Sequence, residues 1–252
     1  MNILVAIPVF NEERHVAAVL RQVRKFTSKI VVIDDGSTDD TSAILAKEKS
    51  IERISHPVNR GYGAALISAF EFAIEQGVDA LITMDCDGQH EPERIPVLGE
   101  AIGDCDIASA SRYLRDFHQD THTPEDRKQI NSLITREINL RYGLQITDAF
   151  CGFKAYRTSA LRQLVIKECG WGMPLEVWVQ AASLGLRIRE VAVPRIYLDP
   201  SRAFGGMLND STSRLAYYRQ VLLEAEERAA WPKGHPCSPF TFDHLLSIGS
   251  SR

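Results

Sequence analysis

Long apolar runs are missing from this 252-residue sequence. The longest, Ile3 to Phe10, has the length of a strand and includes Pro8, whereas a membrane-spanning helix needs about 20 apolar residues. The N-terminus lacks the basic flank and the small-residue cleavage site of a signal peptide. We therefore expect a cytoplasmic protein without a membrane span or a secretion signal.

Cysteine pairs and an excess of one charge are missing as well. The five cysteines are an odd number and form no Cys-x-x-Cys pair, so neither a disulfide framework nor a zinc site is expected. The 29 lysines and arginines against 33 aspartates and glutamates leave a net charge of −4. Such a balance does not indicate a nucleic acid partner.

Several common catalytic motifs are absent. The sequence has no G-x-x-x-x-G-K-[ST] phosphate loop and no G-x-S-x-G elbow. The Gly-Tyr-Gly run at 61–63 could begin a dinucleotide fingerprint, but Leu66 stands where the third glycine belongs. His118 and His122 have helical metal-ligand spacing, yet they lie in a polar stretch without a Glu or Cys partner. Nucleotide hydrolysis, serine hydrolase chemistry and a nicotinamide site are therefore not favoured.

Residues 1–110 alternate short β-branched runs with helical periodicity. Apolar residues recur at i, i+3, i+4 and i+7 between Val16 and Val23, which predicts a helix, and Asn11 is a candidate for its N-cap. The alternation predicts an α/β fold with a mainly parallel central sheet covered by helices. The expected strands are Ile3–Ile7, Ile30–Ile33, Ile51–Ile54, Ala80–Met84 and Ile107–Ala110.

The second half of the chain is less regular. Polar residues and Pro124 predict a loop, and Asp210 or Ser211 should cap the last helix. We expect one domain over residues 1–230 and a tail over 231–252. The expected elements are a loop over 113–128, a helix with Ile130, Ile134 and Ile138 on one face, a strand over Ile188–Val193 and a helix over Leu215–Ala229.

Each strand end in the first half is followed by a polar cluster. The carboxyl ends of parallel strands lie at one edge of a sheet, where ligands bind, so these clusters should line one crevice. They occupy residues 8–13, 34–39, 59–63 and 85–90.

Asp85 and Asp87 are the most informative pair in these clusters. Carboxylates at i and i+2 face the same way if the strand continues, and two crowded negative charges are stabilised by a cation. Oxygen ligands favour Mg²⁺ or Mn²⁺ over zinc, and such ions complete their shell with water and phosphate. The alternative is a solvated turn.

Together these motifs resemble the inverting family 2 glycosyltransferases, and within them the polyprenyl (dolichyl) phosphate mannose and glucose synthases. The resemblance covers about residues 1–230. It implies a GT-A type fold, with residues 1–110 binding the nucleotide sugar and 111–230 the acceptor. The motifs are IPVFNEE (7–13), DDGSTDDT (34–41), NRGYGAAL (59–66), MDCDGQH (84–90), SRY (111–113) and DAFCGFKAYR (148–157).

The resemblance implies a reaction and roles for individual residues. A hexose would move with inversion from a GDP-mannose or UDP-glucose type donor, with Mg²⁺ or Mn²⁺ as cofactor. Arg112 would bind the donor or acceptor phosphate, and Asp87 and Arg112 would take part in catalysis. Asp85, Asp87 and Gln89 would hold the metal and diphosphate. The other donor-binding residues would be Pro8, Phe10, Glu12, Asp34 or Asp35, and Arg202.

The acceptor side is less well defined. Arg127, Asn131 and Asp148 would line it, although these synthases often have a serine where Asn131 follows Arg127. Glu176 begins an apolar helical pattern and is either a structural carboxylate or a polar wall of the acceptor pocket. If the acceptor is a hydroxyl, Glu176 or Asp148 would be the base. Trp171 and Trp178 are expected to be packing residues rather than sugar platforms.

The resemblance favours a lipid-phosphate acceptor at the membrane surface. It implies a peripheral position at the inner face of the membrane and leaves room for a membrane-bound partner subunit, although neither 113–141 nor 195–228 forms a polybasic patch. Transfer to a saccharide or other hydroxyl and a non-catalytic nucleotide-sugar-binding subunit are the alternatives. Residues 113–128 and 201–208 are expected to order when substrate binds.

Overall fold

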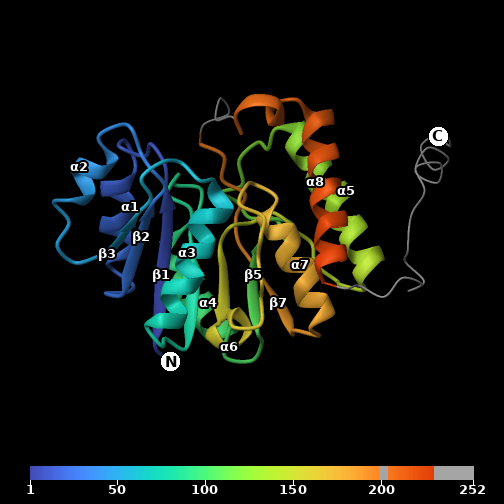
Figure 1. Ribbon diagram of the computed structural model, residues 1–252, viewed down its shortest axis with the longest axis horizontal. Helices are drawn as coiled ribbons and strands as arrows, with labels where there is room; N and C mark the ends of the chain where they lie inside the picture. Colours follow the sequence, from blue (N-terminus) through green and yellow to red (C-terminus); the bar gives the residue numbers. More distant parts are fainter. Residues whose placement is uncertain (199–203, 230–252) are drawn as a thin grey trace.

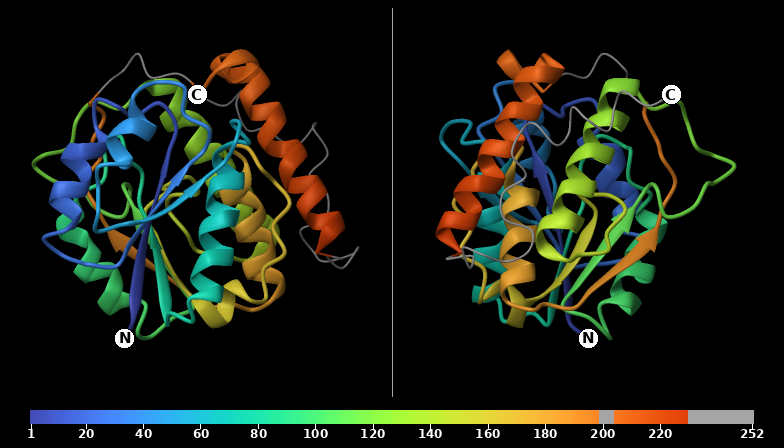
Figure 2. Two further views of the ribbon diagram at one scale, coloured as in Figure 1. Left: turned by 60° about the vertical axis from the view of Figure 1, so that its left-hand side comes forward. Right: turned by 90° about the vertical axis from the view of Figure 1, so that its right-hand side faces the viewer.

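The computed structural model describes residues 1–198 and 204–229, in which seven strands form one sheet between two layers of helices (Figures 1 and 2). The strand order is β3-β2-β1-β4-β6-β5-β7. Neighbouring strands are parallel except that β6 is antiparallel to both β4 and β5. The strands are β1 Ile3–Val9, β2 Ile30–Asp34, β3 Glu52–Ser55, β4 Ala80–Thr83, β5 Ile107–Ser111, β6 Lys154–Arg157 and β7 Ile188–Ala192.

Helices follow the strands along the chain, and the parallel strands all end at the same edge of the sheet, whereas the antiparallel β6 ends at the opposite edge. The α-helices are α1 Val16–Val23, α2 Thr41–Leu45, α3 Tyr62–Glu75, α4 Ile95–Ala101, α5 Glu125–Tyr142, α6 Thr158–Leu161, α7 Met173–Ser183 and α8 Ser211–Arg228. Two 3-10 helices, η1 Pro92–Arg94 and η2 Gly206–Asn209, precede α4 and α8.

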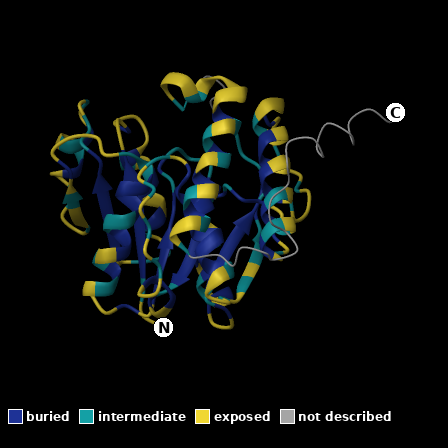
Figure 3. Ribbon diagram, turned by 45° about the vertical axis from the view of Figure 1, so that its right-hand side comes forward, coloured by how far each residue is buried: buried dark blue, intermediate teal, exposed yellow. Residues whose placement is uncertain are grey.

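Each face of the sheet has its own apolar core. On β1, Leu4 and Ala6 pack toward α3, α5, α7 and α8, whereas Val5 and Ile7 pack toward α1, α2 and α4. Because both faces are covered, the strand residues are apolar at consecutive positions rather than alternate ones. Figure 3 shows the result: the central strands are buried, whereas the edge strands β3 and β7, the outer faces of the helices and the loops are more exposed.

The predicted mainly parallel α/β sheet is confirmed, and five of its six expected strands agree with the structure within one residue at each end. The exception is β1, which continues two residues past its expected end, to Val9. Asp210 caps α8, as its side chain accepts a hydrogen bond from Ser213 N at 2.7 Å. The loop predicted over 113–128 is wrong in its last residues, because α5 begins at Glu125. Glu125 and Asp126 suit the first turn of a helix, and Pro124 directly precedes it.

The strand β6 was not predicted, and it interleaves the two halves of the chain in one sheet. It lies between β4 and β5, which come from the first half. Its insertion brings the preceding loop, residues 148–152, beneath the end of β4, where Thr83 Oγ1 donates to Gly152 O at 2.7 Å. The floor of the site described below therefore comes from the second half of the chain.

Within residues 1–198 and 204–229, none of the helices combines the length and the hydrophobicity needed to cross a bilayer. The cysteines in this part of the chain, Cys86, Cys105, Cys151 and Cys169, are free thiols. The predicted tail over 231–252 lies outside the described residues.

Candidate active site

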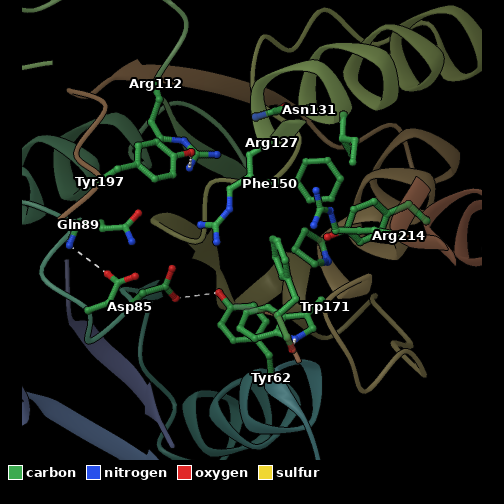
Figure 4. A pocket seen from close by; sticks show the side chains of 15 residues that line it. Tyr62, Asp85, Gln89, Arg112, Arg127, Asn131, Phe150, Trp171, Tyr197 and Arg214 are labelled. Atoms are coloured by element: carbon green, nitrogen blue, oxygen red, sulfur yellow. Dashed lines mark hydrogen bonds between the residues drawn. The ribbon is translucent and has the colours of Figure 1, made fainter. Parts of the chain in front are cut away.

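Two pockets lie at the carboxyl ends of the strands and share a wall. The larger, about 710 Å³, is lined by residues at the ends of β1 to β4. The smaller, about 170 Å³, extends toward α5, α7 and α8 (Figure 4). A ligand in one pocket would therefore be in contact with a ligand in the other at the shared wall. The shared residues are Tyr62, Asp85, Asp87, Trp171 and Phe204.

The four polar clusters of the sequence meet in the larger pocket, as expected. Among the predicted nucleotide-sugar residues, Pro8, Phe10, Glu12 and Asp35 line it together with Asp85. Glu12 is buried, and its backbone N–H donates to Thr41 Oγ1 at 2.8 Å.

Asp34 and Asn11 have structural roles in the neighbouring loop. Asp34 does not line either pocket: its carboxylate accepts hydrogen bonds from Ser37 N at 3.0 Å and Ser42 Oγ at 2.5 Å. Of the two aspartates proposed for the donor, Asp35 is therefore the one at the pocket. Asn11 does not cap α1, which was the prediction. It has a φ of 56° and its side-chain oxygen accepts from Thr38 N at 2.8 Å.

Asp35 organises the floor of the larger pocket. Its carboxylate accepts from the backbone N–H groups of Arg60 and Gly61 at 2.9 and 2.8 Å, and lies 2.6 Å from His56 Nδ1. The other ring nitrogen of His56 lies 2.9 Å from Ser68 Oγ on α3. The imidazole thus ties β3 and α3 to Asp35, a role that the sequence did not indicate.

Asp85 and Asp87 suit a divalent cation. They lie at the junction of the pockets, where Tyr62 Oη donates to Asp85 Oδ1 at 2.9 Å and Gln89 N donates to Asp87 Oδ1 at 3.0 Å. The Gln89 side chain lines the smaller pocket. No group of three or more carboxylate, histidine or cysteine ligands occurs among the described residues. Two carboxylates therefore fit an ion that keeps open positions for phosphate and water, such as Mg²⁺ or Mn²⁺.

His90 and Tyr62 support Asp85 from below. His90 Nδ1 accepts from Asp85 N at 3.0 Å, and its Nε2 lies 3.7 Å from Asp85 Oδ2. Burial lowers the pKa of His90, but the charges of Asp85 and Asp87 together with the contact to Cys151 outweigh burial and raise that pKa to about 9. His90 Nδ1 can accept the hydrogen bond from Asp85 N only when Nδ1 carries no proton. Protonation of Nδ1 would therefore break this hydrogen bond. Burial and Asp85 raise the pKa of Tyr62 well above its usual value, so its hydroxyl remains a donor.

Arg112 lines the smaller pocket and is paired with Asp148. Its Nε and Nη2 donate to the two Asp148 oxygens at 2.7 and 2.9 Å, and its Nη1 donates to Tyr197 Oη at 3.1 Å. Asp148 is completely buried. Burial raises the pKa of its carboxyl, but the charge of Arg112 and the hydrogen bonds hold it well below the usual range.

Asp148 is therefore a support for Arg112 rather than an acceptor contact, and the prediction that it lines the acceptor site or serves as a base is wrong. The groups that contact its carboxylate are hydrogen-bond donors, and Asp148 lines neither pocket. Asn131 does line the smaller pocket, while its amide Nδ2 donates to Asp148 Oδ1 at 2.8 Å.

The smaller pocket has one cationic side and one apolar side (Figure 4). Arg127 lines it as Arg112 does, with its guanidinium 5.0 Å from the centre of the Phe204 ring. Arg214 also faces Phe204, at 4.7 Å, and is neutralised by Asp126 at 2.5 Å. The apolar wall is formed by Ile130, Phe150, Pro174 and Tyr218.

Glu176 lies outside both pockets, so its predicted role in catalysis or in the acceptor wall is wrong. It is completely buried at the start of α7. Its Oε2 accepts from the backbone N–H groups of Lys167 and Glu168 at 2.8 and 2.7 Å, and its Oε1 accepts from Arg228 Nε at 2.9 Å. Glu176 is a structural carboxylate that fastens α8 and residues 167–168 to α7.

Two tryptophans behave differently. Trp178 is a packing residue, as expected, and its Nε1 donates to Ala149 O at 2.9 Å. Trp171 lines both pockets, stacks on Tyr62 at 5.0 Å between ring centres, and donates to Phe204 O. Trp171 therefore packs on neighbouring rings, as expected, and in addition forms part of the wall of both pockets. Tyr62 lies in one of the sequence clusters, whereas no pattern marked Trp171, Tyr197 or Phe204.

Arg202 lies outside the described residues, as does the first part of the segment 201–208. The loop that precedes α5 is fastened to the segment after β7. Arg195 binds Asp116 and Asp120 at 2.6 and 2.7 Å, and Tyr197 N donates to Thr121 Oγ1 at 2.7 Å. Polar contacts rather than apolar ones tie the loop to the segment after β7.

The sequence was compared with protein families and with known proteins. The family model described as "Glycosyl transferase family 2" matches residues 4–165. The chain is 31% identical to an undecaprenyl-phosphate mannosyltransferase of Micrococcus luteus, over 84% of this chain and 91% of that protein. It is 27% identical to a polyprenol monophosphomannose synthase of Mycolicibacterium smegmatis, over 75% of this chain and 76% of that one.

A solved structure shares the fold. The glucosyl-3-phosphoglycerate synthase of Mycobacterium tuberculosis, in complex with Mn²⁺, uridine diphosphate and glucosyl-3-phosphoglycerate, superimposes with a TM-score of 0.67. The match covers 92% of this chain and 81% of that chain, at 21% identity. The predicted GT-A type fold is thereby confirmed.

Proposed function

The chain belongs to glycosyl transferase family 2, and from this premise we propose that it transfers a hexose from a nucleotide-diphosphate sugar to a polyprenyl phosphate, with inversion. The observation that carries the proposal is the pair of pockets that share Asp85 and Asp87. One is large enough for a nucleotide sugar, and the other joins a cationic side to an apolar side, as a lipid phosphate requires.

The larger pocket is the proposed donor site. Pro8, Phe10, Glu12 and Asp35 would border the base and ribose of a GDP-mannose or UDP-glucose type donor. Asp85 and Asp87, with the Gln89 side chain, would hold Mg²⁺ or Mn²⁺ against the diphosphate. The bound ion would neutralise the charge that develops on the leaving nucleoside diphosphate. The glucosyl-3-phosphoglycerate synthase of the same fold was crystallised with Mn²⁺ or Mg²⁺ and uridine diphosphate, which supports this assignment.

The smaller pocket is the proposed acceptor site. Arg112 is held by Asp148 and Tyr197 in a fixed orientation, and Arg127 adds a second guanidinium to the same pocket. Planar guanidinium groups are well suited to phosphate oxygens. The apolar wall of Ile130, Phe150 and Pro174 would contact the first part of the lipid chain. The names of two relatives, an undecaprenyl-phosphate mannosyltransferase and a polyprenol monophosphomannose synthase, support a lipid-phosphate acceptor.

The reaction needs no general base with such an acceptor. An oxygen of the acceptor phosphate, already anionic near neutral pH, would attack the anomeric carbon. The bond from that carbon to the nucleoside diphosphate would break on the opposite face, and the nucleoside diphosphate would leave with the electron pair. Both carboxylates predicted as bases, Asp148 and Glu176, are buried among hydrogen-bond donors. This arrangement favours a phosphate acceptor over a hydroxyl.

The enzyme would work at the inner face of the membrane.

Product partition tests the proposal. Purified protein is incubated with Mn²⁺, polyprenyl phosphate in detergent and one labelled donor at a time, including UDP-glucose and GDP-mannose. We expect label in the organic phase with one donor, and none in the presence of a chelator or with Asp87→Ala. Asp104→Ala, at an exposed carboxylate away from the pockets, is the control and should match the wild type.

The other outcomes would contradict the proposal. Label in a water-soluble glycoside would indicate a hydroxyl acceptor. Donor binding without any turnover would indicate a non-catalytic nucleotide-sugar-binding subunit. Full transfer in chelator would rule out the role of the metal.

A further inference from the structure

The carboxylate of Asp85 is held by residues that have no part in the proposed chemistry. Tyr62, the first residue of α3, donates its hydroxyl proton to Asp85 Oδ1 at 2.9 Å. Its ring stacks on Trp171 with 14° between the planes. The hydroxyl therefore approaches Asp85 from a side chain whose own orientation is fixed (Figure 4).

Gly152 packs closely against the same carboxylate and against the Tyr62 hydroxyl. A Cβ at this position would lie 2.6 Å from both Asp85 Oδ2 and Tyr62 Oη, and 2.9 Å from Asp85 Oδ1. Its carbonyl is anchored to β4 by Thr83 Oγ1. Asp85 and Tyr62 thus lie directly on backbone, and no side chain fits beneath them.

These contacts of Tyr62 and Gly152 restrict the rotation of the Asp85 carboxylate. A carboxylate at the end of a strand can rotate about its Cβ–Cγ bond, and each rotation points a different oxygen lone pair at a metal. A hydrogen bond to one oxygen and close packing beneath both leave one orientation. Groups that orient a metal ligand in this way commonly change metal affinity by about 10–100-fold when they are removed.

We infer that Tyr62 is a positioning residue that fixes the orientation of the Asp85 carboxylate toward the divalent cation. The backbone at Gly152 packs against both side chains and holds them in this arrangement. The inference rests on the proposed function, because it assigns a role toward the metal and diphosphate of that site. The ring of Tyr62 would pack on Trp171 equally well without its hydroxyl. The inference therefore assigns a role to the hydroxyl and its hydrogen bond to Asp85.

The test is the affinity for Mn²⁺ measured without turnover. The electron paramagnetic resonance signal of free Mn²⁺ is followed as protein is added, in the presence of saturating UDP or GDP. Tyr62→Phe retains the ring and loses only the hydroxyl, and we expect it to bind Mn²⁺ about tenfold more weakly. In transfer assays the loss should appear as a higher Mn²⁺ requirement, with kcat recovering at saturating Mn²⁺.

Tyr142→Phe is the matched control, because Tyr142 also donates its hydroxyl to a carboxylate, Glu226, at 2.8 Å, on the helix pair α5 and α8. It should bind Mn²⁺ like the wild type. A second variant, Gly152→Ala, adds a Cβ against Asp85 and Tyr62 and should weaken Mn²⁺ binding more than Tyr62→Phe does.

The outcomes separate this inference from the proposed function. If the wild type binds Mn²⁺ with a nucleoside diphosphate and Tyr62→Phe binds it equally well, the inference is wrong and the proposed function stands. If the wild type binds no Mn²⁺ with either nucleotide, both are wrong. Equal losses in Tyr62→Phe and Tyr142→Phe would mean a general effect on the fold, and would also overturn the inference.

Discussion

Single residues at the site act in pairs, in which one group fixes the position of another. Asp148 holds Arg112, Asp35 holds the backbone at 60–61, and Tyr62 holds Asp85. The sequence predicted which residue types gather at the strand ends. It did not separate the member that faces the ligand from the member that supports it, because burial depends on contacts between distant segments. Asp148, Glu176 and Asp34 were misassigned for this reason.

The pair Arg112 and Asp148 leads to a pH-dependent prediction. Arg112→Met leaves the buried Asp148 carboxylate without its partner and should destabilise the protein by about 3–5 kcal/mol at pH 7. In the wild type, the pKa of Asp148 lies below its unfolded value of about 3.9. The ionised carboxylate therefore stabilises the wild type fully above that value, and the contribution is lost only as the pH falls below it.

The variant should behave in the opposite sense. Without a cation, burial raises the pKa of Asp148 above its unfolded value, so the folded variant gains stability as the pH falls toward 5. The difference between the two proteins in urea unfolding should therefore shrink from pH 7 to pH 5. A difference that stays constant over this range would show that the charge of Asp148 is not the cause. Arg187→Met, at an exposed ion pair with Asp106, is the control and should change stability little.

At the scale of the elements, α7 carries a buried carboxylate whose role can be separated from catalysis. Glu176→Gln places an amide NH₂ among the donors of Lys167, Glu168 and Arg228. An unsatisfied buried donor costs about 1–3 kcal/mol, so thermal unfolding should shift to lower temperature while kcat stays within about twofold of the wild type. A large loss of kcat at a temperature where the variant is fully folded would restore a catalytic role. Glu224→Gln, which removes a half-exposed partner of Arg228, is the matched control.

The loop between β5 and α5 gives the second prediction at this scale. Residues 113–124 are held by polar contacts to Arg195 and Tyr197, and Tyr197 also binds Arg112. We expect this loop to become more protected from hydrogen exchange when donor and Mn²⁺ bind, because Arg112 and Tyr197 lie at the pocket. Equal exchange with and without saturating donor would contradict ordering in the donor step. Helix α4, which contributes no residue to either pocket, serves as the internal control.

At the scale of the whole molecule, the layered sheet followed from the alternation of strands and helices, but the position of β6 did not. Lys154–Arg157 is a short segment that carries a lysine and an arginine, and its partners β4 and β5 are far away in the sequence. Lys154 is nevertheless completely buried, and its ammonium donates to Cys151 O. A buried lysine in a central strand contradicts the usual hydrophobic pattern, so the antiparallel insertion could be found only from the structure.

The proposed acceptor side was also harder to predict than the proposed donor side. The clusters of the larger pocket follow consecutive strands, and their common edge follows from parallel topology. The smaller pocket combines α5, α7 and α8 with residues after β7 and the segment at 204, which are far apart in the sequence. The apolar half of that pocket, with Phe150 and Pro174, has no local pattern in the sequence.

The configuration and linkage of the lipid product test the central claim most directly. The product is made from a donor labelled with ¹³C at the anomeric carbon, with Mn²⁺ and polyprenyl phosphate, and is examined by NMR. We expect a hexosyl phosphodiester, recognised by coupling of the anomeric carbon to phosphorus, with an anomeric configuration opposite to that of the donor. A retained configuration, an anomeric carbon without phosphorus coupling, or label found only in free hexose would contradict the account.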